Sequence, residues 1–248
     1  MRYLILSDIH GNWDALSAVQ RHLRQMDCDA VLVLGDLVGY GADPDRVVSA
    51  VRRLPEPAYT VRGNHDRVVT DLGLAAGFNE AAQRAARWTA EHIEESNLRY
   101  LGRLPQGPMQ IAPDISICHG SPIHEDDYLL SAGGAAEAFA AHSAPVTFFG
   151  HTHIPSAFTL ASNGAGVDGT RVAEGGSMEL DPERRYLLNP GSVGQPRDSD
   201  PRASCMTYDD QTREACWHRV EYPIRSAQKR IVAAGLPPIL AERLALGV

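Results

Sequence analysis

Short apolar runs alternate with helix-like stretches along the first part of the chain. Each run is short and bounded by polar or turn residues, which is typical of a buried strand. The stretches between the runs place apolar side chains three or four positions apart, as an amphipathic helix does. We therefore predict strands at residues 3–6, 31–34, 59–62, 115–118 and 146–149, and helices at residues 12–26, 44–54, 78–104 and 137–142.

The pattern changes at residues 156–222, where short strands alternate with turn signals. Asn163-Gly164 and Asp168-Gly169 are dipeptides that favour tight turns, so this region is predicted to form antiparallel hairpins. Residues 223–247 return to a helical pattern, with a break at 236–238. The alternation predicts an α/β (α+β) fold of two mixed β-sheets packed as a sandwich and flanked by helices. With no repeat or low-complexity linker, we predict one domain over residues 1–248, ending in a helical tail.

The composition and net charge argue against some classes of function. The chain is 44% hydrophobic and 22% charged, as in an ordinary globular protein, and its formal net charge is −8. An acidic balance argues against a broad nucleic-acid-binding surface, because such surfaces neutralise phosphates with Lys and Arg. A small anionic substrate remains compatible with it, because bound metal ions can reverse the local charge.

Several site types and locations are disfavoured by missing patterns. The four cysteines show no CxxC spacing, so a zinc ribbon or a dense disulfide framework does not fit. Lys229 is the only lysine, and no GxxxxGK[ST] phosphate loop exists. No apolar stretch reaches 18 residues and no signal-peptide pattern opens the chain, so we expect neither a membrane span nor export, but a cytoplasmic protein.

Six apolar runs are each followed directly by residues of the types that bind metals or phosphates. Because sites in α/β sheets form beyond the carboxyl ends of strands, six such ends on one rim would gather these side chains. Each motif also has a structural interpretation, as a helix cap, a turn or a buried histidine. One metal site explains all six together. The residues concerned are Asp8 and His10, Asp36, Asn64 and His65, His119, His151 and His153, and the turn 189–192.

The residue types indicate which metals to expect. Carboxylates and neutral imidazoles suit Mn, Fe and Zn, and the motifs contain no cysteine. Two divalent ions need a ligand that touches both, and a carboxylate can bridge where an imidazole normally cannot. Two dications balanced by two Asp and one hydroxide leave about one positive charge for an incoming phosphate. We therefore expect two divalent ions, Mn first, with Fe, Zn or Ni as alternatives.

The motifs DxH (8–10), GD (35–36), GNHD (63–66), HG (119–120) and GHTH (150–153) resemble, in this order, the calcineurin-like metallophosphoesterase superfamily. The likeness implies an αββα fold and a two-metal centre with Asp36 as the bridge. By the same resemblance, one ion is bound by Asp8, His10, Asp36 and His153, and the other by Asp36, Asn64, His119 and His151.

The resemblance also implies a mechanism. A metal-bridging hydroxide attacks phosphorus in line, and His65 contacts the phosphate and protonates the leaving oxygen. The usual partner of such a histidine is a carboxylate, and Asp66 is adjacent in sequence.

The substrate is indicated by departures from one branch of the superfamily. Phosphoprotein phosphatases carry GDxVDRG, whereas residues 35–41 read GDLVGYG and lack its Arg. The stretches SDIHGNWDAL and NPGSVGQPRD look more like the small bacterial and archaeal phosphodiesterase-like branch. We therefore expect a phosphodiesterase acting on small or nucleotide-like esters. Its alternatives are a phosphomonoesterase or protein phosphatase, a non-catalytic scaffold with this fold, and a nuclease.

Residues near the motifs have two interpretations each. Arg197 could clamp the substrate phosphate or could pair at the surface with Asp198 or Asp200. Asn12 could lie near the metals, although capping of the following helix is favoured. His124, in the polar loop 119–129, is interpreted as a solvated histidine rather than a ligand, and Tyr40 could line the pocket or simply pack. The sequence indicates no oligomeric state.

Overall fold

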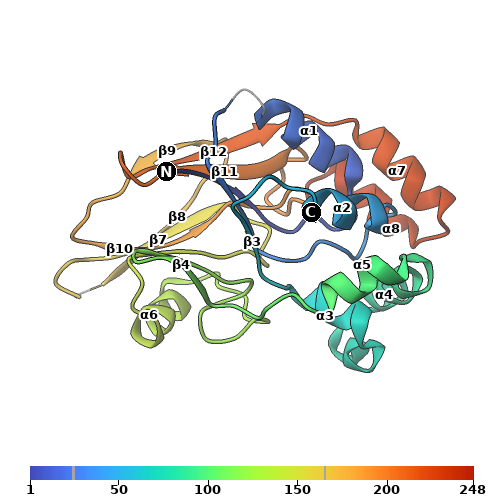
Figure 1. Cartoon of the computed structure of the whole chain (residues 1–248), viewed down its shortest axis with the longest axis horizontal. Coiled ribbons are helices and arrows are strands. Elements are labelled where there is room, and N and C mark those ends of the chain that lie inside the picture. Colours follow the sequence, from blue (N-terminus) through green and yellow to red (C-terminus); the bar gives the residue numbers. More distant parts are fainter. Residues whose placement is uncertain (24–25, 165) are drawn as a thin grey trace.

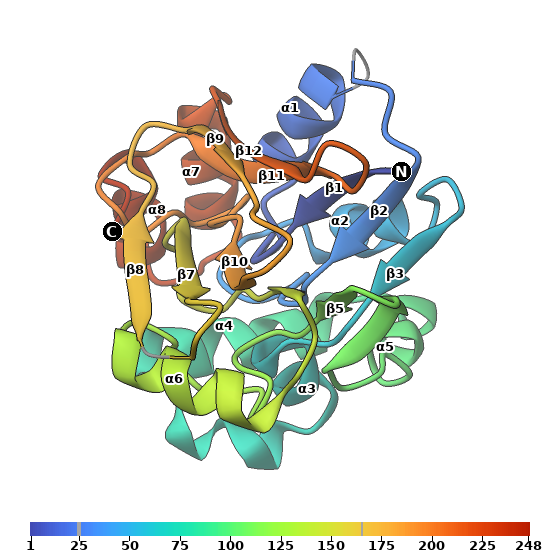
Figure 2. The same ribbon diagram turned by 90° about the vertical axis from the view of Figure 1, so that its left-hand side faces the viewer.

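Two mixed six-stranded sheets pack face to face, with helices on both outer faces (Figures 1 and 2). The computed structural model describes residues 1–23, 26–164 and 166–248. The strand orders are β3-β2-β1-β11-β12-β9 and β4-β5-β6-β10-β7-β8. The strands are β1 (Arg2–Leu6), β2 (Ala30–Val33), β3 (Ala58–Thr60), β4 (Met109–Ala112), β5 (Ile115–Ile117), β6 (Val146–Phe148), β7 (Ser156–Leu160), β8 (Val167–Arg171), β9 (Gly176–Glu179), β10 (Arg185–Asn189), β11 (Ala203–Asp209) and β12 (Glu214–Val220). The predicted sandwich is confirmed.

Each sheet contains a set of three parallel neighbours. In the first sheet β1, β2 and β3 run parallel, and in the second β5, β6 and β10 do so. The remaining pairings are antiparallel. Parallel strands end at the same edge of a sheet, so the loops that follow these six strands are brought to one side.

The central strands β1, β2, β5, β6 and β10 are buried on both faces, which explains the apolar runs of the sequence there. In β1, Tyr3 and Ile5 pack into the core between the two sheets, while Leu4 and Leu6 pack into a second cluster under the helices. This alternation follows from the two-residue period of a strand. The outer face of the second sheet has its own cluster, which includes Phe139.

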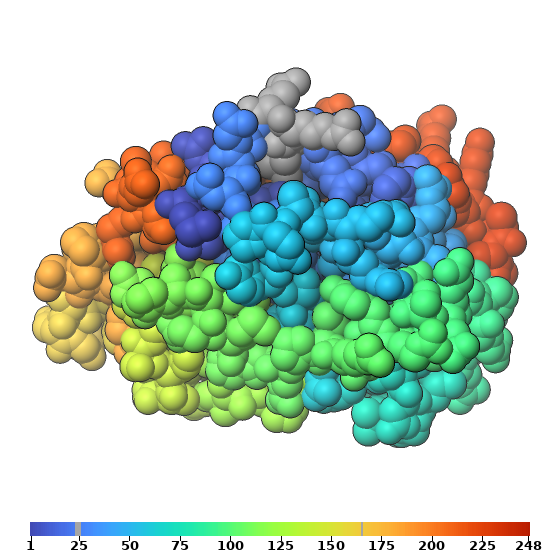
Figure 3. Space-filling model, viewed as in Figure 1, coloured from blue at the N-terminus to red at the C-terminus, as the bar shows by residue number. Residues whose placement is uncertain are grey.

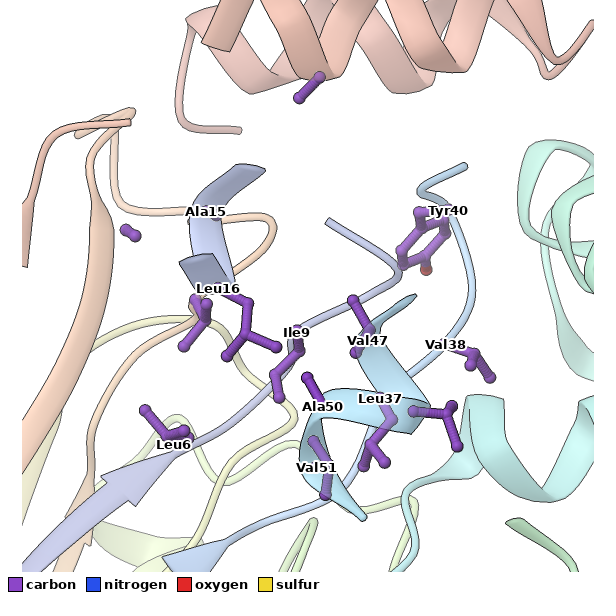
Figure 4. Packing of buried hydrophobic residues seen from close by; sticks show 14 of the residues in the cluster. Leu6, Ile9, Ala15, Leu16, Leu37, Val38, Tyr40, Val47, Ala50 and Val51 are labelled. Carbon is purple, nitrogen blue, oxygen red and sulfur yellow. The ribbon is translucent and has the colours of Figure 1, made fainter. Parts of the chain in front are cut away.

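The helices divide between the outer faces (Figure 2). They are α1 (Trp13–Leu23), α2 (Pro44–Val51), α3 (Asn64–Thr70), α4 (Glu80–His92), α5 (Glu95–Leu101), α6 (Ala132–Ala141), α7 (Ile224–Ala233) and α8 (Pro238–Glu242), with 3₁₀ turns η1 (Leu72–Gly77) and η2 (Arg243–Ala245). Figure 4 shows how Ile9, Leu37 and the α2 residues Val47 and Ala50 gather in one cluster, with Tyr40 at its edge.

Several predicted helices differ from those observed. Residues 78–104 were predicted as one helix but form α4 and α5. The break at Ile93-Glu94 places the Glu94 backbone N–H on Asp45 Oδ1 at 2.9 Å, and the buried Asn97 donates to the same atom. The predicted helix 137–142 begins earlier, at Ala132, where Ser131 caps α6. Helix α3 was not predicted, because its first residues belong to the polar GNHD motif.

One predicted turn is confirmed and one is wrong. Asn163-Gly164 lies in the turn between β7 and β8, where Gly164 N–H donates to the Ala161 carbonyl. Asp168-Gly169 lies inside β8, paired with β7. A side chain at Gly169 would come within 2.9 Å of the Phe158 ring, so this glycine permits close packing across the strands. Strand β4 was not predicted, and residues 24 and 25 of the predicted helix 12–26 lie outside the described residues.

The helical tail is confirmed as α7 and α8, which are separated at the predicted break. Arg230 of α7 pairs with Asp14 and Asp43, so the tail is tied to the first helices. The first half of the chain forms most of the face shown in Figure 3, and the tail reaches its right-hand edge. Among the described residues, no helix is long and apolar enough to span a bilayer. The single-domain interpretation stays a prediction.

Candidate metal centre

Loops at the carboxyl ends of the parallel strands bring the singled-out side chains together. The loops after β1, β2 and β3 meet the loops after β5 and β6 at the edge of the sandwich where these strands end. All of the candidate ligands are buried, with exposed fractions of 7% or less: Asp8, His10, Asp36, Asn64, His119, His151 and His153. Burial of this many polar side chains is costly unless something binds them.

The ligand-type atoms fall into two groups, within each of which all atoms lie within 4.8 Å of one another. The first, which we call the Asp8 group, contains Asp8, His10, Asp36 and His153. The second, the His119 group, contains Asp36, His119 and His151. The Asn64 Oδ1 atom lies 3.1 Å from His119 Nε2 and therefore joins the second group.

Asp36 belongs to both groups. Its Oδ1 accepts a hydrogen bond from the backbone N–H of His65 at 2.8 Å. Its Oδ2 lies 3.5 Å from His10 Nε2 and 3.4 Å from His119 Nε2. The backbone thus holds one oxygen while the other points between the groups, which is the placement that the expected bridging role requires.

Backbone carbonyls fix the tautomers of three histidines. The Nδ1 atoms of His10, His119 and His153 lie 2.9, 2.8 and 2.6 Å from carbonyl oxygens of residues 38, 34 and 195. A carbonyl only accepts, so each Nδ1 carries the proton and, in a neutral ring, Nε2 presents a bare lone pair. Such orientation by a backbone carbonyl is typical of metal-binding histidines.

The imidazole nitrogens and carboxylate oxygens of the Asp8 group converge. His10 Nε2 lies 3.2 Å from His153 Nε2, and Asp8 Oδ1 lies 3.3 Å from His153 Nε2. Within the described part of the chain, Asp8 Oδ1 is buried and has no hydrogen-bond partner. Lone pairs facing one another at these distances repel, and a cation among them removes the repulsion. The donor set of carboxylates and imidazoles fits a divalent metal.

The two groups differ in their proton balance. Burial lowers the pKa of His10 and of His153 well below its usual range, so both rings are neutral, and it raises the pKa of the Asp8 carboxyl to about 7. Burial also acts to lower the pKa of His119, but the Asp36 carboxylate outweighs it and raises that pKa to about 10. In the metal-free protein a proton on His119 therefore partly does what a cation does in the His119 group.

The backbone around the cluster is strained. Five candidate ligands have left-handed φ values of 50° to 64°: Asp8, His10, Asp36, His151 and His153. This region costs non-glycine residues free energy and is often found at functional sites. Gly63 allows a close approach to the shared aspartate, because a Cβ there would lie 2.1 Å from Asp36 Oδ1. The loops are thus built to aim side chains inward rather than to minimise local strain.

The predicted turn at 189–192 supports these loops. Asn189 Nδ2 donates to the Gly150 carbonyl at 2.8 Å and to Thr152 Oγ1 at 3.1 Å. Ser192 Oγ donates to the Asp8 carbonyl at 2.8 Å. The turn therefore supports the loops that carry Asp8, His151 and His153. None of its described side chains is one of the ligand-type groups of the cluster.

Comparison with known proteins decides the family. Residues 1–213 match the profile of the calcineurin-like phosphoesterase superfamily domain. The chain belongs to the calcineurin-like phosphoesterase superfamily. It is 35% identical over 250 residues to the uncharacterized protein MJ0912 of Methanocaldococcus jannaschii, covering 98% of this chain and 97% of that protein.

Solved structures agree with this placement. The crystal structure of a metallophosphoesterase from Sphaerobacter thermophilus superposes with a TM-score of 0.88, with 38% sequence identity and full coverage of both chains. The hypothetical protein PH1004 from Pyrococcus horikoshii OT3 has a TM-score of 0.82 at 18% identity, covering 100% of this chain and 98% of that one, and so shares the fold.

In this calcineurin-like chain His65 lies beside the cluster, and its partner is a tyrosine. His65 Nε2 lies 3.0 Å from the Tyr40 hydroxyl, and the His65 and His10 rings are 5.0 Å apart. Asp66, which is adjacent in sequence, is not the partner of the His65 ring. Both of its oxygens accept backbone N–H groups, from Leu37 at 2.9 Å and from Gly63 at 3.0 Å. Asp66 therefore shapes the turn instead of contacting the His65 ring.

Arg197 lies over the same tyrosine. Its Nη2 donates to Gln195 Oε1 at 2.9 Å and lies 3.5 Å from the Tyr40 hydroxyl. The surface ion pair considered from the sequence is wrong. Asp198 and Asp200 pair instead with Arg219 and, for Asp200, Arg202, and no described carboxylate pairs with Arg197. An unneutralised guanidinium thus remains at the mouth of the cluster.

The other peripheral residues lie as follows. Asn12 caps α1: its Oδ1 accepts the Ala15 N–H at 3.1 Å, and its Nδ2 donates to the Gly194 carbonyl. Both polar ends are used within the protein, so the capping interpretation is confirmed. His124 is exposed in the loop, as expected.

Sequence reasoning missed Tyr128. It is 56% exposed, yet its ring lies 4.0 Å from the His151 ring, centroid to centroid. Its loop is held by Glu125, which is 5% exposed and accepts hydrogen bonds from Arg62 and Arg67. The sequence carried only a weak signal, an aromatic residue in a polar loop, because its contact with His151 joins segments far apart in the chain.

Proposed function

We propose that this protein hydrolyses phosphate esters with two divalent metal ions, and that its substrates are small or nucleotide-like phosphodiesters. The observation that carries the proposal is the buried cluster in which Asp36 is shared between two groups of ligand-type atoms. Membership of the calcineurin-like phosphoesterase superfamily supports the reaction class. A non-catalytic scaffold is disfavoured, because every motif position keeps its expected residue.

The chain's own residues divide the work. Asp8, His10, Asp36 and His153 would hold one ion, and Asp36, Asn64, His119 and His151 the other. Two divalent ions, when bound, supply positive charge and lower the pKa of a water molecule. The carbonyls that fix three imidazoles keep the ligands in place without further reorganisation, which favours a preformed site. Mn is our first choice, with Fe, Zn or Ni as alternatives.

His65 is proposed to move the proton. Burial lowers its pKa to about 4, so the free ring is neutral near pH 7. A phosphate anion beside the ring adds negative charge and acts to raise that pKa, which is the direction that a proton donor requires. His65 Nδ1 faces the turn at Gly39, and a Cβ added at Gly39 would lie 2.5 Å from this nitrogen. The proton passed to the leaving oxygen is therefore assigned to Nε2, which Tyr40 orients.

Arg197 is proposed to grip the phosphoryl oxygens, since its guanidinium has no described acidic partner and can donate two parallel hydrogen bonds. The same observation favours a second candidate function. A monoester carries more negative charge than a diester, and Arg197 supplies positive charge that the GDLVGYG stretch lacks. Phosphomonoesterase activity is thus the alternative to be tested against the diester.

A substrate panel tests the proposal. The protein, loaded separately with Mn, Ni, Zn or Mg, is assayed with bis-p-nitrophenyl phosphate, p-nitrophenyl phosphate, cyclic nucleotides and dinucleoside polyphosphates. We expect metal-dependent turnover, with kcat/KM higher for the bis ester than for the monoester. The reverse order would select the monoesterase. No turnover with any metal, at confirmed metal loading, would overturn the enzymatic proposal.

A further inference from the structure

The exposed ring of Tyr128 lies directly against a candidate ligand of the metal centre. Its centroid is 4.0 Å from that of the His151 ring, with 34° between the two ring planes. A separation this short brings a face of the Tyr128 ring against the imidazole, because an edge-on arrangement keeps the centroids further apart. Tyr128 is nevertheless 56% exposed. The opposite face of its ring is therefore open to solvent beside the His119 group.

The neighbours of Tyr128 in the loop hold its ring outside the core. Leu129 is buried in the outer cluster of the second sheet, together with Phe139. On the other side, the Asp127 carboxylate accepts a hydrogen bond from Ser121 Oγ at 2.7 Å. Turning the Tyr128 ring inward would expose Leu129 and break this hydrogen bond. An exposed aromatic side chain is thus kept at the metal centre, where burying it would otherwise be favourable.

The turn that precedes Tyr128 is tied to the GNHD motif. The Glu125 carboxylate accepts hydrogen bonds from Arg62 and Arg67, which flank residues 63–66. Arg67 also pairs with Asp126 at 2.8 Å. The loop is therefore fixed to the segment that carries the candidate ligand Asn64 and the proposed proton donor. A ring that the protein already holds in place loses little conformational entropy when a ligand packs on it.

We infer that the open face of Tyr128 stacks on a nucleobase of the substrate while the metal centre holds the phosphate. The inference rests on the proposed function and narrows its substrate class to nucleoside phosphodiesters. Stacking on an aromatic side chain tolerates any base, because every base has a π-face. Tyr128 therefore determines specificity for the presence of a base and not for its identity.

The stacked base is assigned to the half of the diester that stays on phosphorus. His65, the proposed proton donor, lies beside the Asp8 group, with its ring centroid 5.0 Å from that of His10. Tyr128 lies against His151, which belongs to the His119 group. The leaving oxygen must face His65 to receive its proton. A base on Tyr128 therefore belongs to the other ester substituent.

A matched pair of esters isolates the base. Thymidine 5′-(p-nitrophenyl phosphate) and its abasic analogue, 1,2-dideoxyribose 5-(p-nitrophenyl phosphate), share the diester, the leaving group and the position of the sugar, and differ in the base. We expect the wild type to prefer the thymidine ester by about 10-fold or more in kcat/KM, as stacking of one base provides. Tyr128→Ala should reduce this preference to about one. Tyr128→Phe keeps the ring and should retain most of the preference.

Leu130→Ala is the matched control. It truncates a similarly exposed side chain two positions further along the loop, which lines a separate hollow with Phe158 and Thr170. It should keep the wild-type preference, and an equal loss there would show a general disturbance of the loop. No preference in the wild type, or an unchanged preference in Tyr128→Ala, would show that Tyr128 does not contact the base. Each of these results overturns the inference.

Metal content is measured for every variant, because Tyr128 also covers a candidate ligand. Should Tyr128→Ala lose an ion or fail to fold, Tyr128→Leu replaces it, since leucine covers His151 without offering a flat aromatic face. The preference for the thymidine ester should then fall while the metal content stays at the wild-type value. A wild-type preference in metal-loaded Tyr128→Leu would contradict stacking.

A binding experiment separates this inference from the proposed function. If the wild type hydrolyses neither ester, the proposed function fails, and calorimetry with the Mn-loaded protein decides the stacking. Thymidine 5′-monophosphate should then bind about 10-fold more tightly than 1,2-dideoxyribose 5-phosphate to the wild type, and the two should bind equally to Tyr128→Ala. Equal binding of both compounds by the wild type would overturn the inference.

Discussion

The Asp8 group and the His119 group share Asp36 but satisfy their charges differently. The Asp8 group contains two carboxylates, and its two histidines present bare Nε2 atoms 3.2 Å apart. The His119 group has Asp36 as its only carboxylate among the described residues, together with the neutral Asn64 amide. A proton on His119 relieves the repulsion there, whereas in the Asp8 group both rings are neutral and only the Asp8 carboxyl, whose pKa burial raises to about 7, takes up a proton.

This difference ranks the two sites. An ion in the Asp8 group gains attraction from two carboxylates, so it should bind more tightly. An ion in the His119 group gains attraction from Asp36 alone among the described carboxylates, and it competes with a proton held more tightly on His119 than the one on Asp8. His151, which belongs to the weaker group, lies under the exposed Tyr128 ring. We therefore infer that the ion of the His119 group is the one that exchanges more readily.

Removing the charge of the shared carboxylate should abolish metal binding in both groups, and with it the difference between their affinities. Asp36→Asn takes a ligand charge from both groups, so both ions should be lost and kcat/KM should fall by about 10³-fold or more, since metal charge stabilisation is worth several kcal/mol. Metal content by elemental analysis and turnover of bis-p-nitrophenyl phosphate check this. Asp168→Asn makes the same change on the exposed strand β8 and should alter neither. Near-normal turnover of Asp36→Asn would count heavily against the shared ligand.

A variant beside the groups should leave both intact. His65→Ala removes the proposed proton donor but no ligand, so kcat should fall by about 10²–10⁴-fold while two ions per chain remain. The exposed His92 provides the control, as His92→Ala should keep both properties. Loss of metal from His65→Ala would mean that His65 supports a group rather than transferring a proton.

Paired substitutions compare the groups directly. His10→Ala removes a ligand from the Asp8 group and His151→Ala removes one from the His119 group. We expect His151→Ala to lose one ion and keep the other through dialysis against a mild chelator. In His10→Ala the affinity of the Asp8 group for its ion should fall by about 10–100-fold or more, because the group loses a ligand. Ion-by-ion release followed by calorimetry checks this, and identical release from the two variants would contradict the ranking.

The sequence predicted the fold where one local pattern determines one element. The run at residues 3–6 is apolar at every position because β1 is buried on both faces, and a continuous apolar run bounded by polar residues is a strong strand signal. The single helix over 78–104 failed because Asp45, far away in sequence, captures Glu94 and Asn97. Gly169 was wrongly assigned to a turn. A glycine is needed there because the Phe158 ring on the neighbouring strand leaves no room for a side chain.

The candidate site divides in the same way. Ligand-type residues could be predicted because each directly follows an apolar run, and parallel strands bring their ends together. Partners that reach the site from other loops could not. Tyr40 contacts His65 across 25 positions, and Tyr128 contacts His151 across 23. Such contacts depend on how loops pack, which no local pattern records.

The smallest expected effect comes from the hydroxyl that links His65 to Arg197. Tyr40→Phe keeps the ring packing against His10, at 4.6 Å between centroids, but leaves His65 Nε2 without its 3.0 Å partner. One hydrogen bond is worth about 0.5–1.5 kcal/mol, so kcat should fall about 2- to 10-fold with both ions retained. Tyr59→Phe, a hydroxyl removal in β3, should not change kcat. Two outcomes would contradict this role of Tyr40. Loss of an ion from Tyr40→Phe would mean that Tyr40 holds His10 in the Asp8 group. An unchanged kcat would mean that packing against Phe78, at 4.5 Å between ring centroids, orients the His65 ring without the Tyr40 hydroxyl.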